Sequence, residues 1–535
     1  MSRLRLALAC TLAAAAAGCA TLGDQKQFEA HLGSQSVAVR ECAEWYRALD
    51  GAVDAAGVRD VQYARLAGFP YLRVDRPHAS LRERAVKSEA ALQLFAERLL
   101  ELDIESRRYE IENLPARDFA ALSGVGQDIS RSAALQRTRA CGRLLREIDL
   151  AKPTARAAML ASAQVPDDYS DASRVLGLYP LTRLPFARGV RRAEAESIAA
   201  FSREPEAAAD TMLVRFAPPR APAQMTRIAV AALLGRAELD ALGQPELSER
   251  ELGRIAAVYA PSFEIAVSGD YDRFGQLRWG RSGPPQVDAA APSAYVQRSF
   301  TRYRELSQNG REPGPNGRDR ILLQLVYTIW FPERPPLENA DLLAGKLDGL
   351  VWRVTLAPDG EPLLYDSIHP CGCYHQFFPT PRARPRPAPD SLEEWAFVPQ
   401  SLPRVGEDEH PVVRLASRTH YIEQVSLARD ADGVGRYAFQ DYGSLRSLPL
   451  PEGGRRSLFG PDGLVAGTER GERFLFWPMG IRSAGAMRQW GRQATAFVGR
   501  RHFDDADLIE RRFELDLADP PQADSAGALA KGGPQ

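Results

Sequence analysis

The strongest strand signal in the sequence is Ile-Leu-Leu-Gln-Leu-Val-Tyr-Thr-Ile-Trp-Phe at residues 321–331, which Pro332 ends. β-Branched and aromatic residues of this kind favour a buried, pleated strand. A second strand pattern covers residues 350–356, and the turn Ala-Pro-Asp-Gly at 357–360 joins it to a third strand at Pro362–Ile368. Turn residues between two strand patterns predict a β-hairpin. Because strand patterns recur from about residue 210 onward, we predict a β-rich domain over residues 210–518.

The chain ahead of this domain repeats its apolar residues at helical spacing. Trp45, Leu49 and Val53 form one such series, and Phe95 and Leu99 belong to another. Spacings of three and four residues place apolar side chains on one face of a helix. We therefore predict a helical domain over residues 19–165 and an α+β fold for the whole chain.

A connector at residues 166–209 separates the two predicted domains. Pro180 and Pro185 interrupt its apolar stretch at residues 175–190. Because proline lacks a backbone N–H and clashes with the preceding turn, this stretch is not expected to form a regular helix. We expect an extended segment on a domain surface or a loop that docks near a membrane, followed by a helix at about residues 191–203. Residues 519–535 are rich in Pro, Gly and Ala, which predicts a disordered tail.

Composition excludes several classes of protein. The 535 residues are 44% hydrophobic and 26% charged, as in globular chains and unlike disordered ones. Lys and Arg number 68 against 69 Asp and Glu, so the net charge gives no sign of a nucleic-acid partner.

The first residues carry a targeting signal. Arg3 and Arg5 precede an uncharged stretch at residues 6–17, which is too short to span a membrane. The stretch ends in Ala16-Ala17-Gly18-Cys19 and resembles the lipobox of bacterial lipoproteins, although Ala16 stands where Leu is usual. The resemblance implies a signal peptide at 1–18 and lipidation of Cys19, with the lipid bilayer as partner of the acylated amino terminus. Ala20, and not Asp, follows Cys19, and by the same resemblance this favours the outer membrane over retention in another membrane. The body of the protein would then face the periplasm.

Four further cysteines remain in the mature chain, and export would expose them to an oxidising compartment, where free thiols are unusual. Cys42 and Cys141 fall on the apolar sides of two predicted helices, and Cys371 and Cys373 lie far away in the sequence. A Cys42–Cys141 disulfide is therefore expected, with two buried thiols as the alternative.

The chemically unusual segment is His369-Pro370-Cys371-Gly372-Cys373-Tyr374-His375. Thiolate and imidazole are ligands that zinc and copper prefer, so His369, Cys371, Cys373 and His375 are candidate metal ligands. On a straight strand the outer pair would lie about 20 Å apart, so a single ion requires the chain to bend, which Gly372 permits. His420, which ends a strand-like run, is the candidate distant partner.

Three interpretations of this segment remain open. It binds zinc or copper, or Cys371 and Cys373 form a strained, easily reduced disulfide that exchanges with other thiols, or the turn is only structural. The first makes the chain a metal-binding envelope lipoprotein. The others make it a thiol-redox protein or a non-catalytic envelope scaffold that binds another envelope protein. The sequence leaves open whether the chain is an enzyme.

Overall fold

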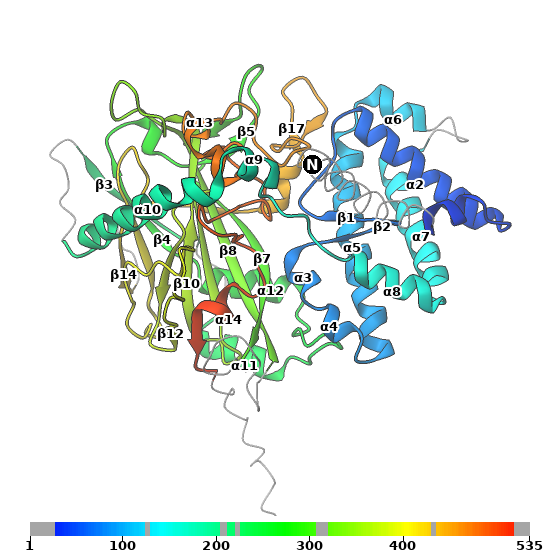
Figure 1. The fold of residues 1–535 in the computed structure, drawn as a ribbon, viewed down its shortest axis with the longest axis horizontal. Helices are drawn as coiled ribbons and strands as arrows, with labels where there is room; N and C mark the ends of the chain where they lie inside the picture. The colour runs from blue at the N-terminus through cyan, green and yellow to red at the C-terminus, as the bar shows by residue number, and fades with distance from the viewer. Residues whose placement is uncertain are drawn as a thin grey trace, which may run out of the picture.

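The computed structural model describes residues 27–122, 129–203, 211–219, 225–305, 319–429 and 435–517. The predicted signal peptide, Cys19 and the predicted tail lie outside these residues. Helices come first, and a larger strand-rich region with mixed sheets follows, which confirms the α+β prediction (Figure 1). No helix in the described ranges is both long and apolar enough to cross a membrane.

The amino-terminal region packs its helices around one apolar core. The helices are α2 (Val37–Ala55), α3 (Arg76–Ala79), α4 (Arg82–Ala85), α5 (Glu89–Asn113), α6 (Ala116–Leu122), α7 (Arg131–Leu150) and α8 (Pro153–Ser162). Buried Trp45 and Leu49 of α2 and Phe95 and Leu99 of α5 belong to this core, as the helical spacing predicts. The region also contains a β-hairpin that the helical prediction missed, formed by β1 (Ala64–Leu66) and β2 (Phe69–Val74).

A disulfide joins α2 to α7. Cys42 and Cys141 are bonded across 99 residues of sequence, with their Cα atoms 5.0 Å apart. The predicted pairing is therefore confirmed. Linking two helices of one core in this way mainly restricts the unfolded chain, which is how a disulfide with a long loop stabilises a fold.

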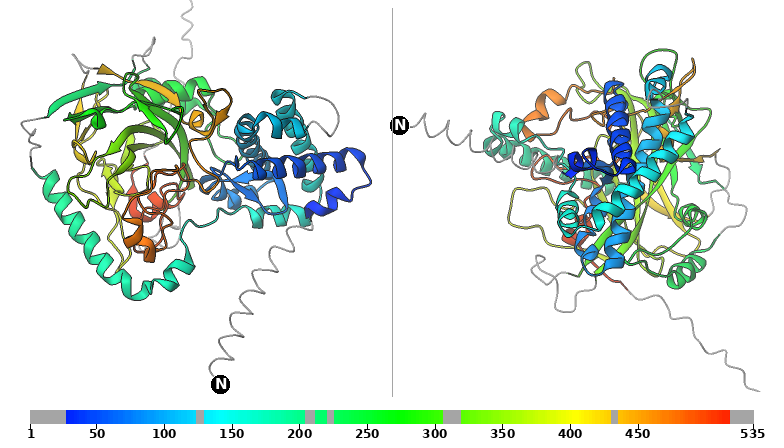
Figure 2. Two further views of the ribbon diagram at one scale, coloured as in Figure 1. Left: turned by 90° about the horizontal axis from the view of Figure 1, so that it is seen from above. Right: turned by 90° about the vertical axis from the view of Figure 1, so that its right-hand side faces the viewer.

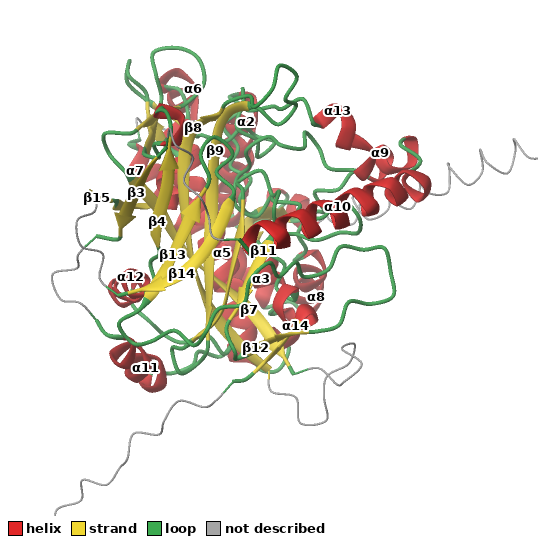
Figure 3. Ribbon diagram, turned by 90° about the vertical axis from the view of Figure 1, so that its left-hand side faces the viewer, coloured by secondary structure: helices red, strands yellow, loops and turns green. Residues whose placement is uncertain are grey.

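The connector is helical where an extended segment was expected. It forms α9 (Asp171–Leu176) and α10 (Tyr179–Phe201), and α10 projects from the body (Figures 2 and 3). Pro180 lies in the first turn of α10, where a backbone N–H has no helical partner to lose. Pro185 lies inside the helix and removes only one hydrogen bond, so the proline argument against a helix was wrong here.

Two sheets make up the strand-rich region. One has the order β11-β10-β9-β8-β7-β16 and the other β14-β13-β4-β3-β15. Their strands are β3 (Met212–Ala217), β4 (Ser262–Val267), β7 (Ser293–Arg304), β8 (Asp319–Arg334), β9 (Gly345–Leu356), β10 (Pro362–Ile368), β11 (Gln376–Pro379), β13 (His410–Leu415), β14 (Ile422–Ala428), β15 (Gly435–Arg436) and β16 (Ala438–Asp441). The predicted hairpin is β9 paired with β10.

Shorter elements surround the sheets. They are α11 (Arg227–Arg236), α12 (Glu249–Val258), η2 (Asp270–Asp272), β5 (Gln276–Arg278), β6 (Gln286–Asp288), β12 (Ala383–Pro385), η3 (Tyr442–Arg446), β17 (Leu448–Pro449), β18 (Arg455–Arg456), α13 (Arg473–Phe476), η4 (Trp477–Met479), α14 (Leu508–Arg512) and β19 (Phe513–Leu515).

Strand β8 explains why residues 321–331 are apolar at almost every position. Leu325, Tyr327 and Ile329 pack into the core shared with the second sheet. Val326 and Trp330 pack on the opposite face, against loops from the last part of the chain. A strand covered on both faces needs no polar side, so its sequence runs apolar without alternation.

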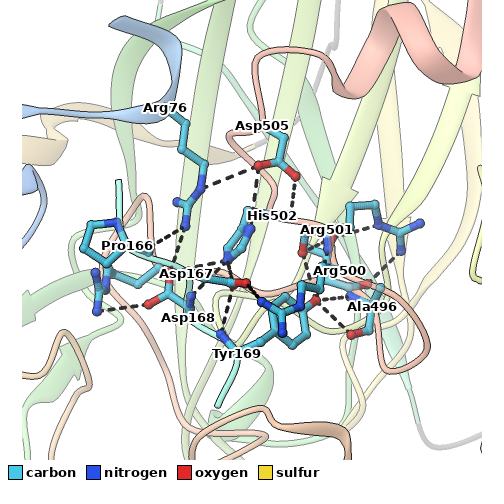
Figure 4. A network of polar contacts seen from close by, with 12 residues as sticks. Arg76, Pro166, Asp167, Asp168, Tyr169, Ala496, Arg500, Arg501, His502 and Asp505 are labelled. Carbon is cyan, nitrogen blue, oxygen red and sulfur yellow. Dashed lines mark hydrogen bonds and ion pairs between the residues drawn. The ribbon is translucent and has the colours of Figure 1, made fainter. Parts of the chain in front are cut away.

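Buried ion pairs join the two regions. Arg446 of η3 donates to Asp60 of the amino-terminal region, and Gln489 donates to the same carboxylate over 2.7 Å. A second junction lies around the connector, where Arg76 donates to Asp168 over 3.1 Å and pairs with Asp505 (Figure 4). These contacts fix the helical region against the loops that cover the large sheet.

Candidate functional site

The Cys-Gly-Cys segment forms a tight turn between β10 and β11. The backbone N–H of Gly372 donates to the carbonyl of His369 over 2.7 Å, and that of His369 donates to the carbonyl of Cys373 over 3.0 Å. Gly372 has a φ of +94°, and a Cβ there would lie 2.5 Å from the carbonyl oxygen of Ala494. Only glycine fits this position without strain, so the bend that the metal hypothesis required is present.

The two cysteines of the turn are free thiols on either side of Gly372. Cys371 is buried, with 3% of its surface exposed, while Cys373 is half-buried. Interaction with the Cys373 thiol lowers the pKa of Cys371 despite its burial, whereas interaction with Cys371 and burial both raise the pKa of Cys373. Cys371 is therefore the sulfur that more readily becomes a thiolate.

The histidines of the segment point to different carboxylates. His369 Nδ1 lies 3.1 Å from Oδ1 of Asp348, on β9, and His420 Nδ1 lies 2.9 Å from the other oxygen of the same carboxylate. His375 Nε2 instead lies 3.1 Å from Asp366 on β10. The structure thus brings the candidate distant partner His420 beside His369, and it places His375 elsewhere.

The arrangement does not gather the candidate ligands around one point. Within the part of the chain that the structure describes, no group of three or more His, Cys, Asp or Glu residues is placed to hold a metal ion. Of the predicted ligands, Cys371 and Cys373 lie together in the turn on either side of Gly372.

Asp348 is the centre of a buried charged cluster. Burial alone would raise the pKa of its carboxyl, but His369 and the guanidinium of Arg470 hold that pKa well below the usual range. Arg470 donates to Asp348 over 3.2 Å. We call Asp272, Asp348, His369, His420 and Arg470 the Asp348 cluster.

The two histidines of the cluster differ in charge. Burial lowers the pKa of His369, which is therefore neutral near pH 7. Burial also acts against the charged form of His420, but the carboxylates of Asp272, 3.4 Å from Nε2, and of Asp348, 2.9 Å from Nδ1, outweigh it and raise the pKa. Neutral His369 and a more readily protonated His420 therefore share one ionised carboxylate beside the thiol turn.

Backbone strain is concentrated around the turn and the cluster. Among the described residues, six non-glycine residues have positive φ: Leu178, Leu347, Tyr374, Arg418, His420 and Ser483. Leu347 and Tyr374 adjoin Asp348 and Cys373, and the backbone N–H of Arg418 donates to Asp272. The carbonyl of Ser483 accepts from Arg488, which also donates to the carbonyl of Cys371. Such strain costs about 1–3 kcal/mol per residue and gathers where surrounding structure holds a site in a fixed geometry.

Sequence reasoning missed Asp348 and Arg470. Asp348 begins the apolar run of β9, and a carboxylate beside such a run is a signal that could have marked it. Arg470 lies in a loop among many other arginines, and its local sequence carries no such mark.

Comparisons with models of known protein families, with curated proteins and with solved structures give no significant match for this chain. Its function is therefore inferred from its own residues.

Proposed function

We propose that this chain is a lipid-anchored envelope protein that exchanges thiols and disulfides at Cys371 and Cys373. The observation that carries the proposal is the pair of free thiols that flank Gly372 in a tight turn. The bend at Gly372 is what a disulfide between these two residues requires. A disulfide across a single residue departs from relaxed geometry, so it is easily reduced again.

The proposed reaction uses a disulfide of a partner protein as the oxidant. The half-buried Cys373 is the sulfur that a partner can reach, and it attacks one partner sulfur while its proton passes to the departing partner sulfur, so the partner S–S bond breaks and a mixed disulfide forms. Cys371, whose pKa is lowered, then attacks the sulfur of Cys373 and releases the second partner thiol. The site loses two electrons and two protons, and the partner disulfide gains both to become two thiols.

The Asp348 cluster supports this turn by position. Arg470 lowers the pKa of Cys371 and also holds Asp348, so one cation connects the thiol pair with the buried histidines. We assign the cluster a positioning role.

Redox titration tests the proposal. The mature chain without its signal peptide, carrying Cys19→Ser, is equilibrated in glutathione buffers of graded potential and then alkylated. Mass spectrometry should show two thiols at residues 371 and 373 titrating together, while the Cys42–Cys141 pair, the internal reference, stays oxidised. Thiols that remain reduced at every potential contradict a redox role.

A second candidate function is metal binding at the same turn. It is favoured by the two adjacent sulfur donors, since thiolates select zinc and copper. Elemental analysis and titration with Zn²⁺ or Cu⁺, on the parent and on Cys371→Ser with Cys373→Ser, distinguish this role. One ion per chain that the double variant loses supports it. If neither metal binding nor disulfide exchange is detected, the remaining interpretation is that the turn is only structural.

Membrane anchoring is proposed on the lipobox-like residues that end in Cys19. Mass spectrometry of the chain extracted from bacterial membranes should find acyl chains on Cys19. We expect more than one chain, because a single acyl chain gives only marginal membrane binding. The Cys19→Ala variant should instead appear in the soluble fraction. An unmodified Cys19 in membrane-extracted protein contradicts this part of the proposal.

A further inference from the structure

Eight exposed apolar side chains form one patch beside the connector. We define the apolar patch as Val175, Leu176, Leu178, Leu181, Leu184, Phe474, Leu475 and Trp477. The exposed fraction of these residues runs from 43% at Trp477 to 77% at Leu176. They account for eight of the eighteen large apolar residues that are exposed in the described ranges. Scattered single residues of this kind are ordinary on a surface, whereas a cluster marks an interaction site.

The patch is built from two segments that are distant in sequence. Helix α9 packs on η4 so closely that a Cβ at Gly177 would lie 2.6 Å from the Cα of Pro478. On the inner side, the rings of Phe186 and Phe476 lie 5.6 Å apart, and Phe476 also contacts Phe497 over 4.7 Å. These contacts between half-buried aromatic rings hold α10 against α13, so the outward apolar residues stand on a packed support.

The patch lies on a part of the molecule that projects. Figure 3 shows α9, α10 and α13 standing out together on one side of the body. Figure 1 places α10 at one end of the longest axis and the dark blue start of the described chain at the other, so the patch would meet a bilayer independently of a lipid on Cys19.

Charges beside the patch suit an anionic surface. Arg188, Arg191 and Arg192 of α10 are exposed, and Glu196 is paired with Arg192. Trp477 stands at the patch itself, and tryptophan favours the boundary between lipid headgroups and hydrocarbon. Apolar side chains flanked by arginines are the composition of surfaces that lie in a membrane interface.

We infer that the apolar patch inserts into the headgroup region of an anionic phospholipid bilayer and orients the body on the membrane. The inference is independent of the thiol site. It is also independent of lipidation, because the patch itself supplies the contact.

Vesicle binding by the unacylated chain tests the inference. The mature chain with Cys19→Ser should sediment with vesicles of phosphatidylethanolamine and phosphatidylglycerol. Leu176→Asp with Phe474→Asp should lower the partition coefficient at least about tenfold, because burying charge in place of apolar area removes the driving force. Val86→Asp with Ile228→Asp is the matched control, since these residues are 67% and 66% exposed and lie outside the patch. The control should bind like the parent.

A second measurement locates the contact. Brominated lipids should quench tryptophan fluorescence on binding, and Trp477→Phe should lose most of that quenching while still sedimenting with vesicles. The inference is overturned if the parent does not bind, or if the patch variant and the control bind equally. It is also overturned if the patch variant instead dissociates a dimer in sedimentation equilibrium and the parent ignores vesicles, because the patch would then join two copies of this chain.

Discussion

The two cysteine pairs of this chain differ in everything except the residue type. Cys42 and Cys141 lie 99 residues apart in sequence, on two helices of an apolar core, and are joined in a disulfide. Cys371 and Cys373 are two residues apart in a glycine turn and remain thiols, and the charge of Arg470 in the Asp348 cluster lowers the pKa of Cys371. A long loop makes a cross-link valuable to stability, whereas a short one contributes almost nothing to it. The difference shows that the first pair cross-links the fold, and it supports the proposal that the second pair serves chemistry.

Removing the helix-to-helix disulfide should have the largest effect. Cys42→Ala with Cys141→Ala should lower the free energy of unfolding by about 4 kcal/mol, because a loop of this length restricts the unfolded chain strongly. Urea unfolding followed by circular dichroism measures the change. The matched control is Cys371→Ser with Cys373→Ser, which should cost about 1 kcal/mol or less because these free thiols form no cross-link to lose. Equal losses in the two double variants would remove the distinction between the pairs.

Asp348→Asn should have the next largest effect, since it leaves Arg470 and His420 without their shared carboxylate. Breaking a buried ion pair costs about 3–5 kcal/mol, and we expect about 3 because the amide oxygen still accepts one hydrogen bond. Asp270→Asn is the control, because that side chain is fully exposed, and it should change stability by less than about 0.5 kcal/mol. A similar small loss in both variants would show that the Asp348 cluster contributes no more than a surface carboxylate.

The same contrast separates what the sequence predicts from what it does not. The hairpin of β9 and β10 follows from its own turn residues, and the Cys42–Cys141 pairing follows from helical spacing and elimination. Asp348 could not be paired with His420 in advance, because the contact depends on how distant strands and loops meet. The connector was mispredicted because Pro180 lies in the first turn of α10, where proline is tolerated, and because α10 accommodates Pro185 in its interior.

A pH dependence at His375 provides the smallest test. Burial lowers the pKa of His375 to about 3, against an unfolded value near 6.5. Below pH 6.5, His375 binds a proton in the unfolded chain but stays neutral in the folded chain. The contribution of His375 to stability is therefore complete above pH 6.5 and is lost as the pH falls toward 3. His375→Gln removes the titration. The difference in unfolding free energy between parent and variant should therefore shrink by about 2 kcal/mol from pH 8 to pH 5.

The comparison between parent and variant cancels the other titrating groups near the turn. His420 has a raised pKa, so its stabilisation is present at low pH and is lost as the pH rises, but both proteins contain it. The pKa values of Asp348 and Asp272 are lowered, so these carboxyls stay ionised in the folded state down to pH 5. Urea unfolding at each pH gives the difference directly. If the unfolding free energies of the parent and His375→Gln change with pH in parallel, His375 protonates equally in the folded and unfolded states. That result would contradict a lowered pKa for His375 in the folded chain.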